Sequence, residues 1–327
     1  MTLTPNLTAS CPLVLACDGG YAMPLATTLR SIAEANRRWW PLEIYILSNG
    51  FSENMKRKTI DSQPEGSCSI RWAPLDLTGF AGFSTLPHIS TIAYARLLIP
   101  SVLPAGVSRA LYLDADILVL DDLAPLCQLD LEGAVVGAVL DERLDTHVKL
   151  GNTCIAGLPL PSVRDYFNDG ILLIDVAKWR SERIPEKALE YLERCPHTIY
   201  GDQDALNVAC DSVWKNLDPR WNYYQIDLEK PLSDMTPAQR PGIIHFHGWS
   251  KPWDASSLNS NAGFYDNFRT RTLFARTPAK KLVQVPIVIW SRLKKLLKRS
   301  AIVGHVWNRL RSLQSRDGRN SAGRLSV

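Results

Sequence analysis

Short apolar segments alternate with longer amphipathic windows along most of this chain. PLVLAC is followed by a helical pattern over about residues 24–38, and LEIYILS by a second helical pattern over residues 53–60. Alternation of this kind predicts βαβ units and a largely parallel, doubly wound α/β sheet. A length of 327 residues is enough for one such domain with an appendage.

Later segments continue the same pattern. Further strands are expected at SIRWAPLD, ALYLDADILVL, AVVGAVLD, GILLID and GIIHFHG, and further helices over residues 90–98, 186–194 and 264–274. No internal repeat or low-complexity segment interrupts them. We therefore expect one folded domain over residues 1–275, followed by a separate tail over residues 276–327.

The tail differs from the domain in charge. Residues 276–327 contain 13 Lys and Arg residues and one acid, Asp317, which gives this segment a net charge of +12, whereas the whole chain carries +4. The first 275 residues therefore carry a net charge of −8. This division argues against a uniformly basic nucleic-acid-binding protein and predicts different partners for the tail and the domain.

The cysteines and the chain ends indicate the compartment. Seven cysteines are scattered, odd in number and never in a CxxC spacing, which favours a reducing environment over a disulfide framework or a zinc cluster. The N-terminus has no basic stretch ahead of an apolar run, and the longest apolar run of the tail is far shorter than the roughly 20 residues of a spanning helix. We expect a cytoplasmic protein without a transmembrane helix.

Two carboxylates interrupt the apolar run LYLDADILVL, which is typical of a buried central strand. Asp114 and Asp116 are two positions apart, so on a strand both side chains lie on the same face. In a desolvated setting both stay ionised only beside a compensating charge, which a divalent cation supplies. The alternative is a surface turn with two solvated acids.

A second polar group follows the predicted strand in IIHFHGWSKPW. The strand delivers His245, and a Gly248-containing loop then presents Lys251. Two carboxylates with one imidazole favour Mn²⁺ over Mg²⁺, and a lysine nearby can neutralise a bound phosphate. The alternative is a core histidine with satisfied hydrogen bonds.

Two further clusters of polar side chains adjoin apolar runs. YFNDGILLIDVAKWR contributes Asn168 and Asp169, and GDQDALN contributes Asp202, Gln203 and Asp204. Such clusters suit the many directional hydrogen bonds of sugar recognition. Equally, Asp202 can cap a helix that begins at Asp204.

These motifs occur together in a recognisable order. VLACDGGY, HISTIAYARL, LYLDADILVL, YFNDGILLIDVAKWR, GDQDALN and IIHFHGWSKPW have the order and approximate spacing of glycosyltransferase family 8. Over about residues 11–275 the chain most closely resembles the bacterial lipopolysaccharide and lipooligosaccharide galactosyl- and glucosyltransferases, with glycogenin a more distant relative. The resemblance implies a GT-A fold, a mixed Rossmann-like sheet flanked by helices that binds a nucleotide sugar at the strand ends.

The resemblance also implies roles for the matched residues. Asp114, Asp116 and His245 correspond to ligands of Mn²⁺, with Mg²⁺ as the alternative ion. Asp202 corresponds to a hydrogen-bond partner of the donor hydroxyls, and Gln203 to the residue nearest the anomeric carbon. The remaining contacts to the nucleotide sugar are implied for Asp18, Arg96, Asn168, Gly248 and Lys251.

Family 8 enzymes retain the anomeric configuration, and the amide of Gln203 is a poor nucleophile. We therefore expect front-face attack, in which the acceptor hydroxyl enters on the face that UDP leaves. Asp169 stands where relatives usually carry Ala or Ser, so the choice between galactose and glucose stays open. Trp249 either stacks on an acceptor sugar or closes its loop.

Residues 276–327 interleave basic residues with Leu, Ile, Val, Trp290 and Trp307. Such a tail resembles an amphipathic helical segment that lies on an anionic leaflet, and relatives in the bacterial branch often end in a similar one. The alternatives are a solvated helix packed on the domain and a nucleic-acid-binding tail. We expect the membrane surface as the partner of the tail, and no nucleic acid.

The sequence thus predicts a retaining transferase that moves galactose or glucose from a UDP-sugar to an oligosaccharide or glycolipid acceptor. The expected acceptor is the lipopolysaccharide core at the inner face of the cytoplasmic membrane. A non-catalytic, membrane-tethered UDP-sugar-binding protein of the same fold is the alternative. The intact set of Asp114, Asp116, His245 and Lys251 argues against it.

Overall fold

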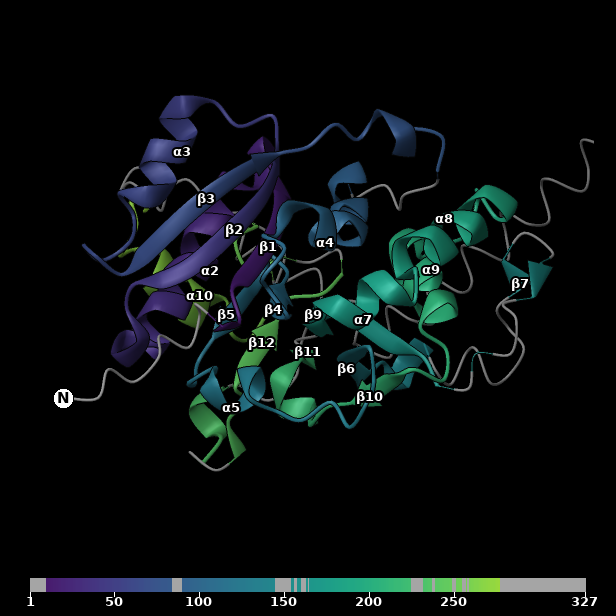
Figure 1. The fold of residues 1–327 in the computed structure, drawn as a ribbon. Coiled ribbons are helices and arrows are strands. Elements are labelled where there is room, and N and C mark those ends of the chain that lie inside the picture. The colour runs from purple at the N-terminus through teal and green to yellow at the C-terminus, as the bar shows by residue number, and fades with distance from the viewer. Residues whose placement is uncertain are drawn as a thin grey trace, which may run out of the picture.

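A computed structural model describes most of the domain. The described residues are 10–83, 90–144, 154–155, 158–159, 163, 165–224, 232–236, 239–248, 251–254, 257 and 259–276. They form two main β-sheets with helices packed around them (Figure 1). The expectations for the tail beyond Arg276 and for Trp249 lie outside this part of the chain.

The larger sheet has seven strands in the order β10-β6-β9-β4-β1-β2-β3. Its strands are β1 (Leu13–Asp18), β2 (Leu42–Asn49), β3 (Cys68–Pro74), β4 (Arg109–Leu113), β6 (Val136–Leu140), β9 (Phe167–Asp175) and β10 (Trp214–Asn216). β9 runs antiparallel to both β4 and β6, while the other neighbouring pairs are parallel. The expected mixed, mostly parallel sheet is confirmed.

Each face of this sheet has its own hydrophobic core, because successive side chains of a strand point to opposite faces. In β1, Val14 belongs to the core on one face, whereas Leu13 and Leu15 belong to the core on the other face. All three side chains are fully buried. Burial on both faces explains why these strands read as continuous apolar runs.

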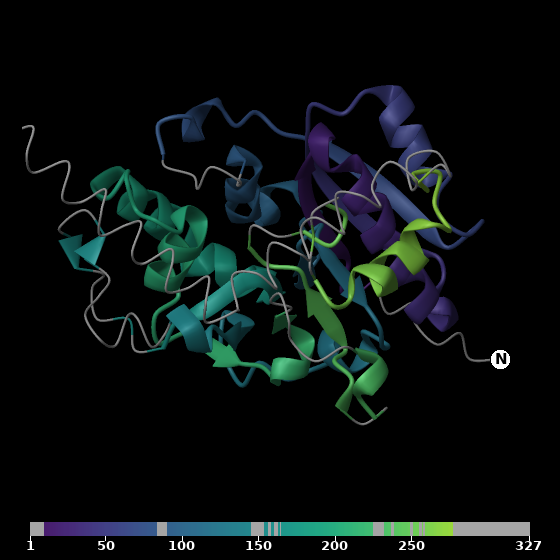
Figure 2. The same ribbon diagram turned by 180° about the vertical axis from the view of Figure 1, so that it is seen from behind.

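The helices divide between the two faces of the sheet. One face carries α2 (Ala22–Ala35) and α5 (Ala124–Cys127), and the other carries the 3₁₀ helix η4 (Thr91–Leu98), α4 (Ile99–Val102), α7 (Val176–Ser181), α8 (Ile184–Arg194) and α9 (Gly201–Ala209). α3 (Glu53–Ile60) and α10 (Ala262–Arg269) both contact α2. The view from behind shows α10, near the end of the described chain, beside α2 near its beginning (Figure 2).

A smaller sheet adjoins the larger one. It has the order β11-β12-β5 and consists of β5 (Ile117–Val119), β11 (Tyr223–Tyr224) and β12 (Ile243–His245), and a separate hairpin pairs β7 (Cys154–Ile155) with β8 (Leu158–Pro159). β5 follows β4 after three residues, so LYLDADILVL supplies one strand to each main sheet. The expectation of one continuous strand is therefore wrong.

The change of sheet has a visible cause in the backbone hydrogen bonds. The amide of Asp114 still donates to Gly170 of β9 at 2.8 Å, but the carbonyl of Asp116 accepts from Phe246, just beyond β12, at 3.0 Å. The hydroxyl of Thr28 in α2 lies 2.9 Å from the carbonyl oxygen of Ala115 between them. Residues 114–116 therefore form a turn that is held from three directions.

Other differences from the expected elements are local. Residues 91–98 form a 3₁₀ helix rather than an α-helix, and α9 begins at Gly201 rather than at Asp204. In the part of the chain that the structure describes, no helix is both long enough and apolar enough to cross a membrane.

Candidate active site

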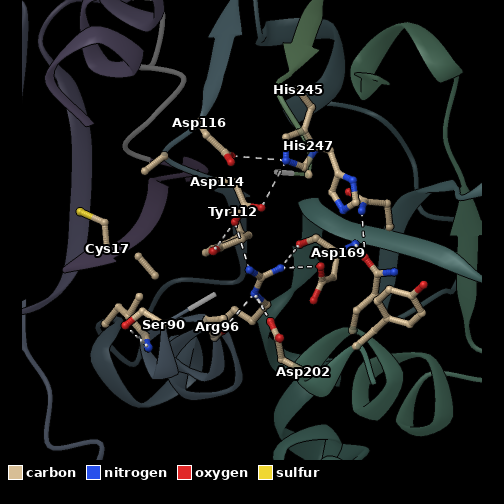
Figure 3. A pocket seen from close by; sticks show the side chains of 18 of the residues that line it. Cys17, Ser90, Arg96, Tyr112, Asp114, Asp116, Asp169, Asp202, His245 and His247 are labelled. Carbon is tan, nitrogen blue, oxygen red and sulfur yellow. Dashed lines mark hydrogen bonds and ion pairs between the residues drawn. The ribbon is translucent and has the colours of Figure 1, made fainter. Parts of the chain in front are cut away.

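A pocket of about 540 Å³ lies where the ends of β1 and β4 meet the smaller sheet. Figure 3 shows its side chains converging from both main sheets and from the helical side of the domain. Every residue singled out from the sequence as a site residue lines it. These residues are Asp18, Arg96, Asp114, Asp116, Asn168, Asp202, Gln203, His245, Gly248 and Lys251.

The turn between β4 and β5 and the end of β12 bring three potential metal ligands together. His245 Nε2 lies 3.6 Å from Asp114 Oδ2 and 3.3 Å from Asp116 Oδ1. One ligand atom from each residue lies within 4.8 Å of the others. Asp116 and His245 are buried and Asp114 is half-buried. The two acids therefore lie in a turn, as the alternative interpretation of the sequence proposed. This turn is not solvated, contrary to that interpretation.

The two carboxylate oxygens of Asp114 have different surroundings. Oδ1 accepts hydrogen bonds from Tyr112 Oη at 2.7 Å and from Arg96 Nη2 at 3.1 Å. Oδ2 is the oxygen that faces His245. Asp114 is therefore oriented through one oxygen while the other remains directed at the centre of the cluster.

Gly170 in β9 lies directly beneath this cluster. A Cβ atom at this position would be 2.4 Å from His245 Cε1 and 2.8 Å from Asp114 Oδ2. Glycine is therefore required by the close approach of two potential ligands, not by its own backbone angle. Nothing in the sequence pattern singled out Gly170, although it follows Asn168 and Asp169 in the same motif.

Lys251 reaches the cluster from the loop after β12. Its Nζ lies 2.5 Å from Asp116 Oδ2 and donates to the carbonyl oxygen of Phe246 at 2.9 Å. Burial opposes ionisation of Asp116, but the charge of Lys251 and its hydrogen bond to this carboxylate outweigh burial and lower the pKa of Asp116. Asp116 is therefore held as a carboxylate.

Arg96 is the centre of a second group of acids. Its Nη2 lies 3.1 Å from Asp114 Oδ1, its Nη1 2.6 Å from Asp169 Oδ1 and its Nε 2.9 Å from Asp202 Oδ2 (Figure 3). The ring of Tyr112 lies under the guanidinium, 4.9 Å away. Burial disfavours the charged form, but the surrounding acids raise the pKa of Arg96. One permanent cation thus connects the cluster of potential metal ligands to α9.

Asp202 does not act as a helix cap. It lies inside the first turn of α9, whose N-cap is Tyr200, and its carboxylate pairs with Arg96. The capping interpretation is therefore wrong, because the helix begins three residues earlier than expected. Asp204 instead accepts a hydrogen bond from the backbone amide of Tyr200 at 3.0 Å.

The carboxyl group of Asp169 is buried beside Arg96. Its side chain is 8% exposed, and its Oδ2 accepts no hydrogen bond from the residues that the structure describes. Burial raises the pKa of Asp169, Arg96 opposes this shift, and the negative charges of Asp202 and Asp114 add to it. Asp169 is thus the acid of the pocket whose charged form is least supported.

Asn168 and Gln203 are both buried and joined to one another. Asn168 Nδ2 donates to Gln203 Oε1 at 2.8 Å, and Asn168 Oδ1 accepts from Asn222 Nδ2 at 2.7 Å. Asn222 Oδ1 lies 2.9 Å from His245 Nδ1. Asn222 was missed in the sequence, because no motif contains it.

Asp18 and Gly248 also line the pocket, in simpler environments. Asp18 ends β1 and accepts a hydrogen bond from the amide of Gly20 at 2.9 Å. Gly19 is required by packing, since a Cβ there would lie 2.3 Å from the carbonyl oxygen of Gly50. Gly248 has φ +87°, a left-handed conformation that favours glycine.

The charge of the pocket favours a cation. Six aspartates line it, against two arginines and one lysine: Asp18, Asp114, Asp116, Asp141, Asp169 and Asp202 against Arg96, Arg143 and Lys251. Two carboxylate oxygens and an imidazole nitrogen form a donor set that suits Mn²⁺ and related divalent ions. The residues present therefore fit a divalent metal ion.

A mixed sheet whose strand ends meet an acidic Asp-X-Asp turn and a buried histidine is the architecture of GT-A glycosyltransferases. Residues 12–257 match the model of glycosyl transferase family 8, and the chain belongs to this family. The predicted resemblance to the family and to its bacterial lipopolysaccharide branch is confirmed.

Individual relatives agree with this assignment. General stress protein A of Bacillus subtilis (strain 168) is 28% identical over 273 residues, 80% of this chain and 93% of that protein. The lipopolysaccharide 1,2-glucosyltransferase of Escherichia coli (strain K12) is 26% identical over 258 residues, 76% of this chain and 74% of that protein. A crystal structure of the galactosyltransferase LgtC with donor and acceptor sugar analogs is similar with a TM-score of 0.69 at 26% identity, over 84% of this chain and 100% of that one.

Proposed function

We propose that this glycosyltransferase moves a hexose, galactose or glucose, from a UDP-sugar to a saccharide acceptor with retention of configuration and with a divalent metal ion, Mn²⁺ or Mg²⁺. The observation that carries the proposal is the convergence of Asp114, Asp116 and His245 in the pocket that also contains Gln203. Metal ligands and a sugar-facing residue in one pocket suit transfer from a diphosphate-linked donor.

Asp114, Asp116 and His245 would hold the metal, which supplies positive charge to the diphosphate as it leaves the sugar. Lys251 would exchange its contact with Asp116 for a phosphate oxygen, since its side chain is only 13% exposed and lies at the cluster. The left-handed Gly248 would present its backbone to the same phosphate. Asp18, which also lines the pocket, would contact the uracil side of the nucleotide.

Arg96 and its carboxylate partners would bind the donor sugar. Asp202 and Asn168 would direct hydrogen-bond acceptors and donors at its hydroxyls, and Arg96 holds Asp202 in place at 2.9 Å. The acidic side chains of Asp169 and Asp202 beside them disfavour an anionic donor such as a uronic acid. A neutral hexose is therefore the donor class that this pocket favours.

The transfer would take place on one face of the sugar. The bond from the anomeric carbon to the diphosphate oxygen breaks, the bond to the acceptor oxygen forms, and the acceptor proton passes to a phosphate oxygen of UDP. Gln203 would stabilise the developing positive charge without forming a covalent bond, because an amide is a poor nucleophile. Asp202 is paired with Arg96 and is therefore a weak candidate for a nucleophile.

The relatives and the tail support the proposed acceptor and location. One relative is named a lipopolysaccharide 1,2-glucosyltransferase, which supports a lipopolysaccharide core acceptor here. A lipid-linked acceptor would also explain the net charge of +12 over residues 276–327, which suits an anionic leaflet. We place the enzyme at the inner face of the cytoplasmic membrane.

The deciding experiment is hydrolysis of a panel of UDP-sugars by the purified chain, without acceptor, in Mn²⁺, Mg²⁺ or EDTA. We expect UDP release from one hexose donor, lost in EDTA and weak with a uronic-acid donor. UDP binding that depends on metal, with no turnover even after saccharide acceptors are added, would instead support the non-catalytic alternative. Absence of metal-dependent UDP binding would contradict the site.

A further inference from the structure

A chain of buried amides connects the two ends of the pocket. It runs from Gln203 through Asn168 and Asn222 to His245, with heavy-atom distances of 2.8, 2.7 and 2.9 Å. Each of these four residues is at most 6% exposed. Asn222 joins the chain from the segment between the 3₁₀ helix Pro219–Trp221 and β11.

The backbone fixes the direction of every hydrogen bond in this chain. The amide nitrogen of Gly170 donates to Asn168 Oδ1 at 3.0 Å, so this atom is the oxygen of its side chain. It follows that Asn222 reaches Asn168 with its nitrogen and His245 with its oxygen. An oxygen accepts only, so His245 Nδ1 must carry a proton and donate it.

A proton held on Nδ1 leaves Nε2 of a neutral imidazole with its lone pair exposed. In His245 this nitrogen is the one that lies 3.6 Å from Asp114 Oδ2 and 3.3 Å from Asp116 Oδ1. The opposite tautomer would place a proton where the metal would bind. It would also leave Nδ1 and Asn222 Oδ1 as two facing acceptors in a buried site.

We propose that Asn222 is a positioning residue that holds His245 in the Nδ1-protonated tautomer and thereby presents Nε2 to a divalent metal ion. This inference rests on the metal site of the proposed function. The same chain orients Gln203, because Asn168 Nδ2 donates to Gln203 Oε1 and so fixes which end of this side-chain amide faces Asn168.

Two substitutions separate this role from a structural one. Asn222→Leu removes the acceptor for His245 Nδ1, and we expect it to weaken Mn²⁺ binding about 10- to 100-fold, the usual effect of losing a partner of a metal-binding histidine. Asn222→Asp keeps an acceptor at Nδ1 while it removes the donor to Asn168. Its Mn²⁺ affinity should therefore stay within a few-fold of wild type even where its melting temperature falls.

The binding assay uses Mn²⁺ alone, without nucleotide, and detects free Mn²⁺ by electron paramagnetic resonance. The matched control is Asn36→Leu, which removes an equally buried amide that bonds the backbone of Leu123 and Ile32, away from the pocket. It should lower the melting temperature and leave the Mn²⁺ affinity unchanged. Equal loss of affinity in both Asn222 variants, or none in Asn222→Leu, would overturn the proposal.

The tautomer of His245 can be measured directly by NMR in the absence of metal. In ¹⁵N-histidine-labelled protein at pH 8.5, where an imidazole is ordinarily neutral, we expect His245 Nδ1 at the shift of a protonated nitrogen and Nε2 at that of an unprotonated one. The reverse pattern in the wild-type protein would contradict the role of Asn222. If the expected tautomer were present but wild type did not bind Mn²⁺, the proposed function would fail while the assignment of Asn222 held.

Discussion

Lys251 Nζ lies 2.5 Å from Asp116 Oδ2, so a cation of the chain itself neutralises one of the two carboxylates of the candidate metal site. Lysine is a compact charge on a flexible stem, and it can turn from a carboxylate to a phosphate without a change in the backbone. The pair therefore keeps the acidic cluster stable and retains a cation for an anionic ligand.

Asp116→Asn should abolish metal binding and reduce UDP release by about 100- to 1,000-fold, as expected for the loss of one group that stabilises developing charge. The melting temperature should change little, because Lys251 keeps its hydrogen bond to the carbonyl oxygen of Phe246 and lines the pocket. UDP release and thermal unfolding measure the two effects. Asp121→Asn, at an acid that is 54% exposed, serves as the control, and wild-type turnover by Asp116→Asn would refute the assignment.

Gly170→Ala should lower both stability and metal affinity. The added Cβ would lie 2.4 Å from His245 Cε1, so the imidazole or β9 must move, at a cost of about 1–3 kcal/mol. Denaturant unfolding and Mn²⁺ titration test this. Gly263→Ala is the control: it lies in α10 with nothing within 4 Å of the new Cβ, and should leave stability equal or slightly higher. Unchanged Mn²⁺ affinity in Gly170→Ala would contradict the close approach.

Asp169→Asn should stabilise the protein more at pH 7.5 than at pH 4.5. Burial raises the pKa of Asp169 in the folded state above the value of about 3.9 in an unfolded chain. Between these two pKa values the folded state therefore binds more protons than the unfolded state. The stability that Asp169 contributes is present at low pH and is lost as pH rises from the unfolded pKa toward the raised pKa of the folded state. The amide does not titrate.

Melting temperatures of wild type and Asp169→Asn across this pH range measure the effect. Asp61→Asn, at an exposed acid, should give a difference from wild type that does not vary with pH. A stabilisation by Asp169→Asn that was greater at pH 4.5 than at pH 7.5 would show that Arg96 outweighs burial at this carboxyl.

Truncation after Arg276 should separate catalysis from membrane binding. Arg276 belongs to the folded part, since its Nη2 donates to the carbonyl of Trp253 at 2.7 Å and its Nη1 lies 3.2 Å from Asp266 Oδ2. The shortened chain should retain UDP-sugar hydrolysis and lose binding to phosphatidylglycerol vesicles, which high salt should also weaken in the full chain. Vesicle binding that survives truncation, or tighter binding of the tail to single-stranded DNA at physiological salt, would contradict the proposed role.

The larger sheet could be predicted well from the sequence because its signals are local. The apolar run of β1, the capped helix α3 and the acid pair in LYLDADILVL are all recognisable within about ten residues. The joint order of six motifs was specific enough to indicate the family. All of the residues that those motifs singled out as site residues line one pocket.

Local signals did not predict where β4 ends. The run LYLDADILVL is equally apolar before and after the aspartates, and the division between two sheets depends on Gly170 and Phe246 as hydrogen-bond partners. The 3₁₀ form of η4 and the early start of α9 were missed for the same kind of reason. Each depends on packing against segments far away in the sequence.

The sequence by itself therefore determined the type of fold, the family and the residue types of the site. Tertiary structure alone decided how these side chains are oriented. Asn222 lies 23 residues from His245 and 54 from Asn168, Arg96 lies 73 residues from Asp169, and Gly170 is needed only because two side chains pack on it. Such contacts form only when distant segments of the chain are brought together, so local sequence propensities do not predict them.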